Sequence, residues 1–327
     1  MLIEGQNSTF LVKLKYCSFK PLINDDELAW PVNWSEQFHR EAPIEVEIGF
    51  GMGEVLMRLA KEFPERNFIG LEQNWERICK TLSAIHRIRR HPLTSLSLDN
   101  IRILSVDARI VFERFFTEQT IDKIYCLFPC PWPKKRHIKH RLFSNAFFNL
   151  LNNRLRKNGE LKIVTDSLAF FEWMRLEGNE SGFRIETQTI KPQYQTKFER
   201  KWQTRGQKEF FELRMLKETH IKIPQEKNTA MKSYRLKFFN PDQFQFENAT
   251  GEISVVLKEV IFDPRRQKAM IHTVVSEAHL TQHFWVMIFK EDNMWRVCKA
   301  DGQKVFATPG TARALELVYE AAKKMDR

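Results

Sequence analysis

The prediction of the fold starts from residues 45–54, which read EVEIGFGMGE. An apolar run, predicted as a strand over 44–48, passes into three alternate glycines and then into a helical pattern over 54–62. Glycine lets the backbone turn tightly and approach a ligand, and the start of the following helix offers free N–H groups. A ligand site at this turn is one interpretation, and a plain tight turn is the other.

Short apolar runs alternate with helical patterns beyond this stretch. Strands are predicted over 44–48, 67–71, 101–106, 121–127 and 160–164, and helices over 54–62, 75–90, 108–117 and 144–156. Residues 210–215 are predicted as a final strand that closes the sheet. Strand and helix in this order imply right-handed crossovers and a doubly wound, mostly parallel sheet with helices on both faces, so the fold class is α/β.

The chain is predicted to contain two domains. Residues 1–43 are an N-terminal arm that packs on the main domain at 44–217, residues 218–233 are a polar linker, and 234–327 form a small α+β domain. The strands of the last domain are predicted over 234–239, 253–262, 269–275, 283–289 and 295–299, with an amphipathic helix over 311–324.

Composition favours a polyanionic partner. The 327 residues carry a net charge of +11, so nucleic acid is the leading candidate and an anionic membrane surface the weaker one. No stretch approaches the roughly 20 apolar residues of a membrane span, and the first residues lack a secretion signal, so we expect a cytoplasmic protein. The five cysteines form no CxxC pair, which argues against a disulfide framework or a metal site of the usual zinc spacing. No oligomeric state is predicted.

Three acids lie at the ends of three successive predicted strands. Glu47 suits a ligand ammonium group, Glu72 the two hydroxyls of a ribose, and Asp107, followed by Ala108, the amino group of an adenine. Because the carboxyl ends of parallel strands share one edge, a nucleoside can lie across all three. The Gly-x-Gly-x-Gly spacing differs from the dinucleotide pattern, so an aminoacyl-type cofactor fits better than NAD. A charged strand terminus is the alternative for Glu72 alone.

Residues 127–141 read LFPCPWPKKRHIKHR, an apolar strand end that passes into a rigid Pro/Trp turn and a basic run. The prolines restrict φ and remove backbone donors, so the loop is stiff. An aromatic face beside many cations is the combination that nucleic-acid binders use. A solvated surface is the alternative for a basic run by itself.

Two later segments are further candidates. Asp166 comes after the strand at 160–164, and its alternative is a helix cap for the segment that starts at Ser167. Residues 196–201 read TKFERK, for which a surface helix or loop is the alternative.

Together these residues resemble the bacterial tRNA (guanine-N7-)-methyltransferase family over about 43–216. Residues 47–53 look like its S-adenosylmethionine motif, 129–141 like its PDPWPKKRHxKRR signature, and 165–166 and 196–199 like its later substrate motifs. The resemblance implies a Rossmann-like S-adenosylmethionine-dependent methyltransferase fold. It also implies tRNA as the partner and methyl transfer to N7 of a variable-loop guanine, conventionally position 46.

The resemblance also implies the site residues. The cofactor-binding set comprises Glu47, Gly49, Gly51, Gly53, Glu72, Asp107, Ala108 and Cys130. The substrate-binding set comprises Lys134, Arg136, His137, Asp166, Thr196, Lys197, Phe198 and Glu199, and the catalytic positions are Cys130 and Asp166.

Two positions depart from the family pattern. Cys130 replaces the aspartate regarded as catalytic, and His140 replaces an arginine. A carboxylate accepts two donors, whereas a neutral thiol does so poorly, so either Asp166 and backbone carbonyls position the guanine or turnover is reduced. A thiolate at Cys130 is a further way to restore the negative charge. The alternatives for function are therefore a catalytically weakened tRNA-binding protein with this fold, or a methyltransferase for another RNA.

Overall fold

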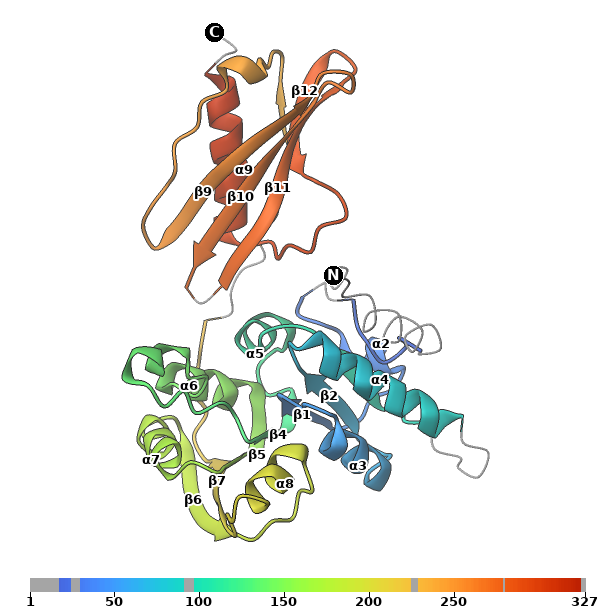
Figure 1. Ribbon diagram of the computed structural model, residues 1–327, viewed down its shortest axis with the longest axis vertical. Helices are drawn as coiled ribbons and strands as arrows, with labels where there is room; N and C mark the ends of the chain where they lie inside the picture. Colours follow the sequence, from blue (N-terminus) through green and yellow to red (C-terminus); the bar gives the residue numbers. More distant parts are fainter. Residues whose placement is uncertain (1–17, 25–29, 91–96, 225–228, 279, 325–327) are drawn as a thin grey trace, which may run out of the picture. The chain divides into compact units, whose positions relative to one another are not determined.

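The computed structural model describes residues 18–24, 30–90, 97–224, 229–278 and 280–324. The chain divides into two compact units, residues 1–226 and 227–327, and this division falls inside the segment that the sequence predicts as a linker. Each unit contains a sheet of its own (Figure 1).

Unit 1 is built on a sheet with the strand order β3-β2-β1-β4-β5-β7-β6. Its strands are β1 (Ile44–Ile48), β2 (Asn67–Leu71), β3 (Ile101–Leu104), β4 (Ile121–Leu127), β5 (Leu155–Thr165), β6 (Phe183–Ile190) and β7 (Phe210–Lys217). The pairs from β3 to β5 are all parallel, and β7 is antiparallel to both of its neighbours. The mostly parallel α/β sheet is therefore confirmed.

Helices connect these strands. They are α2 (Trp34–Phe38), α3 (Glu54–Glu62), α4 (Trp75–Arg89), α5 (Ala108–Ile110), α6 (Asn145–Arg154), α7 (Leu168–Glu177) and α8 (Lys197–Gln203), with a π-helical turn η2 (Val111–Phe115) and a 3-10 helix η3 (Lys135–His140). Helix α4 starts after Asn74, whose side chain accepts a hydrogen bond from the N–H of Arg77, as an N-cap requires. Its apolar side, with Ile78 and Leu82 fully buried, packs in one core cluster with Phe68 of β2.

The structure differs from the predictions in the place of residues 210–215 in the sheet, in an additional strand, and in the helix over 108–117. Residues 210–215 belong to β7, which lies inside the sheet, while the edge is formed by β6, a strand that the sequence pattern did not reveal. Strand β6 is largely polar, with the sequence FRIETQTI, because an edge strand needs little burial. The helix predicted over 108–117 is interrupted, since α5 passes into η2 at Val111.

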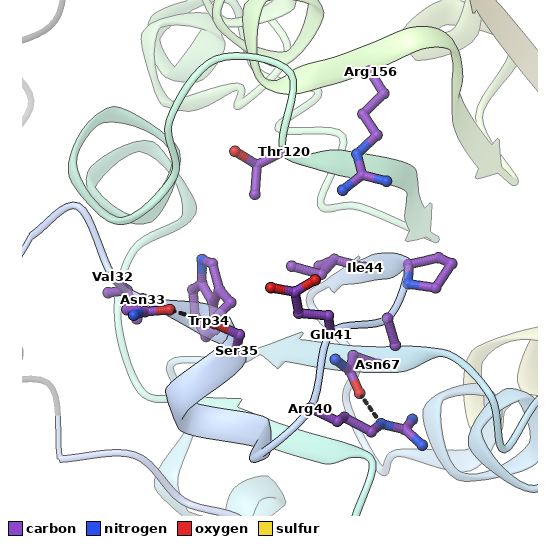
Figure 2. A pocket seen from close by; sticks show the side chains of 12 residues that line it. Val32, Asn33, Trp34, Ser35, Arg40, Glu41, Ile44, Asn67, Thr120 and Arg156 are labelled. Atoms are coloured by element: carbon purple, nitrogen blue, oxygen red, sulfur yellow. Dashed lines mark hydrogen bonds between the residues drawn. The ribbon is translucent and has the colours of Figure 1, made fainter.

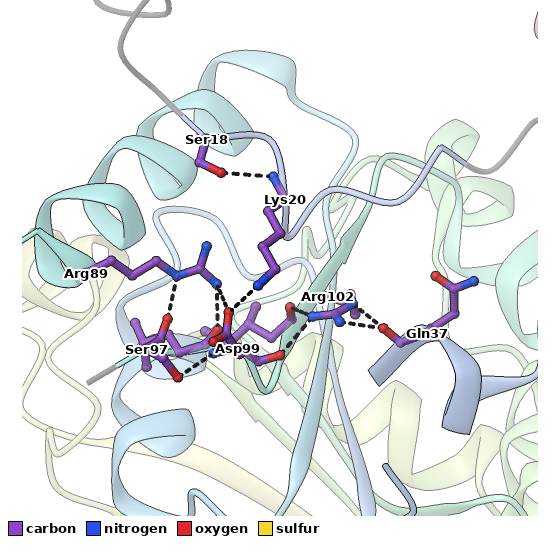
Figure 3. Close-up of polar contacts among 9 residues, drawn as sticks. Ser18, Lys20, Gln37, Arg89, Ser97, Asp99 and Arg102 are labelled. Carbon is purple, nitrogen blue, oxygen red and sulfur yellow. Dashed lines mark hydrogen bonds and ion pairs between the residues drawn. The ribbon is translucent and has the colours of Figure 1, made fainter. Parts of the chain in front are cut away.

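The described part of the N-terminal arm packs along the free edge of β3. Ile23 N–H donates to the carbonyl of Ile103 at 2.9 Å. Figure 3 shows Lys20 beside Asp99, at 3.1 Å. In the same view the Arg102 guanidinium donates to the backbone carbonyl of Gln37, with Nε at 2.8 Å. The edge of the sheet is thus covered by residues that precede it in the chain.

Unit 2 is an antiparallel sheet with the order β8-β12-β11-β10-β9 and one long helix. The elements are β8 (Tyr234–Leu236), the 3-10 turn η4 (Pro241–Gln243), β9 (Ile253–Asp263), β10 (Lys268–Glu277), β11 (Leu280–Glu291), β12 (Met294–Lys299) and α9 (Pro309–Lys323). Leu315 and Val318 of α9 share a buried cluster with Ile271 and Val286 of the sheet. This arrangement confirms the α+β class of the C-terminal part. Within the described ranges, no helix is long and apolar enough to cross a membrane.

Candidate functional site

The site lies where the strand order of unit 1 reverses. Strand β1 pairs in parallel with β2 on one side and with β4 on the other. The loops that come after β1 and β4 therefore leave the same edge of the sheet as neighbours, and such a switch point is where open α/β sheets bind ligands.

The glycine loop after β1 needs glycine for two different reasons. Gly49 and Gly53 have φ of +71° and +69°, a region that side chains disfavour. A Cβ on Gly53 would lie 2.5 Å from Cγ2 of Thr81, whereas a Cβ on Gly49 would meet nothing within 4 Å. Gly53 therefore allows close packing of α3 against α4, and open space lies beside Gly49.

Glu47 has an unsatisfied carboxylate oxygen at the end of β1. The side chain is 5% exposed, and its Oε2 has no hydrogen-bond partner among the described residues. Burial raises the pKa of Glu47 to about 8, and the N–H of Leu56 offsets this only in part. A buried acceptor without a donor is costly. The position therefore fits a ligand that brings a positively charged donor.

Glu72 joins the ends of β1 and β2. Its Oε2 accepts from the N–H of Gly51 at 3.1 Å and from Arg77 at 3.3 Å, and its Oε1 accepts from the N–H of Asn74 at 2.9 Å. Each carboxylate oxygen can accept more than one hydrogen bond, so Glu72 can hold the glycine loop and still accept from ribose hydroxyls.

Asp107 comes after β3 and joins the same edge. Its Oδ1 accepts from the N–H of Arg109 at 2.8 Å and caps α5, while its Oδ2 accepts from Gln73 at 3.0 Å. Ala108 beside it is buried. The three acids are thus brought to one edge, with hydrogen bonds between successive strand ends. A nucleoside that carries an amino-acid group fits this set of donors and acceptors.

The loop after β4 holds two strained residues. Phe128 and Trp132 have φ of +58° and +44°, which side chains adopt only when the surroundings enforce it. Phe128 donates its N–H to Val164 at 2.7 Å. Trp132 is 36% exposed, and its ring lies 5.7 Å from that of His137 and 5.3 Å from that of His140. An indole exposed in this way offers a face on which a base can stack.

The basic residues of this loop are on the surface. Lys134 precedes η3, and Arg136 and His137 lie within it. Lys134 and Arg136 are exposed, and His137 is partly buried. Cys130 is a free, exposed cysteine. Cations beside an exposed indole suit a phosphate backbone with an accessible base.

Asp166 comes directly after β5. Burial raises its pKa above the usual range for an aspartate. Its backbone carbonyl accepts from Gln207 at 3.0 Å. Helix α7 is capped by Ser167, whose hydroxyl accepts from the N–H of Phe170 at 3.3 Å. The interpretation of Asp166 as a helix cap was therefore wrong.

Glu199 is occupied by backbone donors. It is 1% exposed, its Oε1 accepts from the N–H groups of Gln193 and Tyr194 at 2.8 and 3.1 Å, and its Oε2 accepts from Gln195. Thr196 caps α8 by accepting from the N–H of Glu199 at 3.1 Å. This pair shapes the loop before α8, and its carboxylate does not lie open to solvent.

Helix α8 is tied to the glycine-loop side of the site. The N–H of Lys197 donates to Glu54, the first residue of α3, at 2.9 Å, and Arg200 also pairs with Glu54. The Phe198 ring lies 5.7 Å from the guanidinium of Arg77, which itself pairs with Glu72. The structure thus places residues 197–199 next to the sheet edge that carries Glu47, Glu72 and Asp107, which we call the cofactor edge.

Arg109 and Arg141 were not among the predicted site residues. Arg109 donates to the carbonyl of Arg141 at 3.0 Å, and Arg141 donates to the carbonyl of Pro131 at 3.0 Å. No spacing in the sequence could have revealed these contacts, because they join segments 32 and 10 residues apart.

A cavity of about 550 Å³ lies at the opposite edge of the sheet (Figure 2). Ile44 and Asn67, the first residues of β1 and β2, line it. Arg40 donates to Asn67 there at 2.8 Å. None of the predicted site residues contributes to this cavity, so it is separate from the candidate site.

Comparisons with known proteins place the chain among methyltransferases. A family model described as a putative methyltransferase matches residues 41–212. A tRNA (guanine-N(7)-)-methyltransferase of Chlorobium phaeobacteroides is 41% identical over 62% of this chain and 93% of its own. One of Thermotoga maritima is 31% identical over 89% of this chain and 93% of its own. Among solved structures, a 16S rRNA (adenine(1408)-N(1))-methyltransferase of Catenulisporales acidiphilia, with cosubstrate SAM, has a TM-score of 0.45 at 16% identity, over 58% of this chain and 92% of that chain.

Proposed function

The chain belongs to the tRNA (guanine-N(7)-)-methyltransferase family, and from this premise we propose that it transfers the methyl group of S-adenosylmethionine to N7 of a guanine in tRNA. We assign the target to the variable loop, at position 46, and the place of action to the cytoplasm. The observation that carries the proposal is the pairing of an acid-lined nucleoside edge after β1–β3 with a basic, aromatic loop after β4.

Glu47 is the residue that supports the choice of cofactor. Its buried Oε2 lacks a donor among the described residues, and the amino-acid ammonium of S-adenosylmethionine supplies one. Glu72 and Asp107 then accept from the ribose hydroxyls and the adenine amino group. We also assign the glycine loop, Ala108 and Cys130 to the cofactor side. When bound, S-adenosylmethionine offers a methyl group on a positively charged sulfur.

The substrate side needs alignment more than acid–base chemistry. Guanine N7 already carries a free lone pair and loses no proton on methylation, so orientation accounts for much of the rate. Trp132 supplies a stacking face for a base withdrawn from the tRNA fold, and Lys134, Arg136 and His137 contact the phosphates. Asp166 accepts from the guanine edge.

Residues 196–199, at the start of α8, contribute to the substrate site mainly by positioning other residues. Glu199 and Thr196 shape the loop before the helix through backbone hydrogen bonds, so they position their neighbours. Lys197 and Phe198 stand beside the glycine loop and Arg77 and line the entry for the target nucleotide.

The second candidate function is a tRNA-binding protein with weakened catalysis. Cys130, in place of the family aspartate, favours it, because a thiol is a poorer acceptor than a carboxylate. Asp166 counts against it, because Ser167 and not Asp166 caps α7, so the carboxylate of Asp166 remains available to position the guanine. We therefore favour the active enzyme.

Unit 2 enlarges the tRNA contact in this proposal. Exposed cations along its sequence suit phosphates, which position a nucleic acid without reading its bases; they are Lys232, Arg235, Lys237, Lys258, Arg265 and Arg266. We take residues 218–233 as the linker and 1–43 as an arm of the catalytic unit.

The test is methyl transfer from labelled S-adenosylmethionine to an unmodified tRNA transcript, with the product mapped by chain cleavage at 7-methylguanosine. Cleavage at the variable-loop guanine is expected. A transcript with adenosine at that position is the control and should accept no label. Binding of tRNA without incorporation of label would support the weakened binding protein and refute the enzyme.

A further inference from the structure

Arg109 connects an acid of the cofactor edge to the basic loop. Its guanidinium lies 3.7 Å from Oδ2 of Asp107 and donates to the backbone carbonyl of Arg141 at 3.0 Å. The side chain is 22% exposed, so both contacts are partly shielded from water. One side chain thus contacts the end of β3 and the end of η3 at the same time.

Arg141 binds the backbone of the Pro/Trp turn. Its Nε donates to the carbonyl of Pro131 at 3.0 Å. Its guanidinium lies 4.7 Å from the ring of Trp173 and 5.2 Å from that of Phe170, both on α7. A planar guanidinium between a carbonyl and two aromatic rings has few alternative positions, and lysine cannot reproduce this geometry.

We propose that Arg109 and Arg141 couple the cofactor pocket to the RNA-binding loop, so that each ligand strengthens the binding of the other. This inference rests on the proposed function, since it takes Asp107 as a cofactor ligand and Trp132 as a base contact. The two arginines are positioning residues in this proposal, because Arg109 acts through Asp107 and the carbonyl of Arg141, and Arg141 acts through Pro131.

The contacts explain how the coupling works. A ligand on Asp107 fixes the carboxylate that also pairs with Arg109, and Arg109 then holds the carbonyl of Arg141 in place. Arg141 in turn fixes Pro131, the residue before Trp132. Trp132 already has the disfavoured φ of +44°, so its conformation depends on such support. Binding of the cofactor therefore reduces the cost of ordering the turn for RNA.

The experiment measures S-adenosylhomocysteine affinity by calorimetry, without tRNA and with a saturating tRNA transcript. The ratio of the two affinities is the coupling. In the unaltered protein we expect a ratio of at least about fivefold, the lower range for coupled sites. Arg109→Met, which keeps the length of the side chain and removes its donors, should bring the ratio close to one.

Two further variants separate coupling from general damage. Arg141→Lys leaves Asp107 and its direct partners intact, so it should lower the ratio while S-adenosylhomocysteine alone binds as before. Arg175→Met is the matched control on α7, because Arg175 pairs with Glu172 at 2.9 Å, outside this chain of contacts, and it should keep the full ratio. Thermal melting checks that each variant is folded.

A ratio of one in the unaltered protein, or a full ratio in Arg109→Met, would overturn the coupling even if methylation proceeds normally. An unaltered protein that neither binds nor methylates tRNA would overturn the proposed function and the inference with it. Methyl transfer by the unaltered protein therefore distinguishes the two failures.

Discussion

Cofactor affinity should increase as the pH is raised from 6 to 7.5, because Glu47 must lose a proton to pair with an ammonium group. Burial raises the pKa of Glu47 to about 8 in the ligand-free protein, so the carboxyl is largely neutral at pH 6. A bound ammonium favours the carboxylate and lowers that pKa. Binding then releases a proton, and by linkage such binding becomes tighter as the pH rises.

The size of the effect depends on the ionised fraction of Glu47. With a pKa of about 8, the ionised fraction is about 1% at pH 6 and about 25% at pH 7.5, so the affinity should rise about 25-fold. The ligand's own α-amino group titrates at about 7.7–8.0 and is about 60–75% protonated at pH 7.5, so its titration lowers the expected rise to about 15- to 19-fold.

Calorimetry of S-adenosylhomocysteine binding in two buffers with different ionisation enthalpies measures both the affinity and the number of protons released on binding. We expect release of nearly one proton per ligand at pH 6. The matched variant Glu47→Gln should bind more weakly, with a flat pH profile and no release. Equal affinities of the unaltered protein at pH 6 and 7.5, or uptake of a proton, would refute the reasoning.

Three further predictions concern the loops of the site. Gly53→Ala should lower the free energy of unfolding by about 2–5 kcal/mol in urea titration, because a positive φ costs about 1–2 kcal/mol and overpacking about 1–3, here against Thr81. Gly49→Ala lacks that clash and should cost only about 1–2 kcal/mol; equal losses for the two variants would contradict this account. Trp132→Ala should raise KM for tRNA about 5- to 150-fold, since stacking on one base contributes about 1–3 kcal/mol, and should leave S-adenosylhomocysteine affinity unchanged; an unaltered KM would exclude the stacking role. Cys130→Asp should raise kcat for methyl transfer because a carboxylate accepts two donors from the guanine edge, and a variant no faster than the unaltered protein would show that this position does not limit turnover.

The α/β class and much of the sheet could be predicted from local patterns along the chain. The strands at 44–48, 67–71 and 121–127 and the helix at 54–62 agree with the structure at both ends, because short segments rich in apolar and β-branched residues predict strands and a 3.6-residue apolar period predicts helices. The acids after β1, β2 and β3 could be placed on one edge from the order of elements alone, since parallel strands end at the same side. Local pattern carries this information.

Other features of the fold and the site depend on contacts between segments that are distant in the sequence. The edge strand β6 has no apolar pattern to reveal it, since one side of it needs no partner. Among the described residues, Oε2 of Glu47 has no hydrogen-bond donor, whereas the carboxylate of Glu199 accepts from backbone N–H groups. This difference depends on which donors the fold brings near each acid. The link from Arg109 to Arg141 joins residues 32 positions apart. Such contacts depend on folded geometry, and the spacing of residues along the chain carries no record of them.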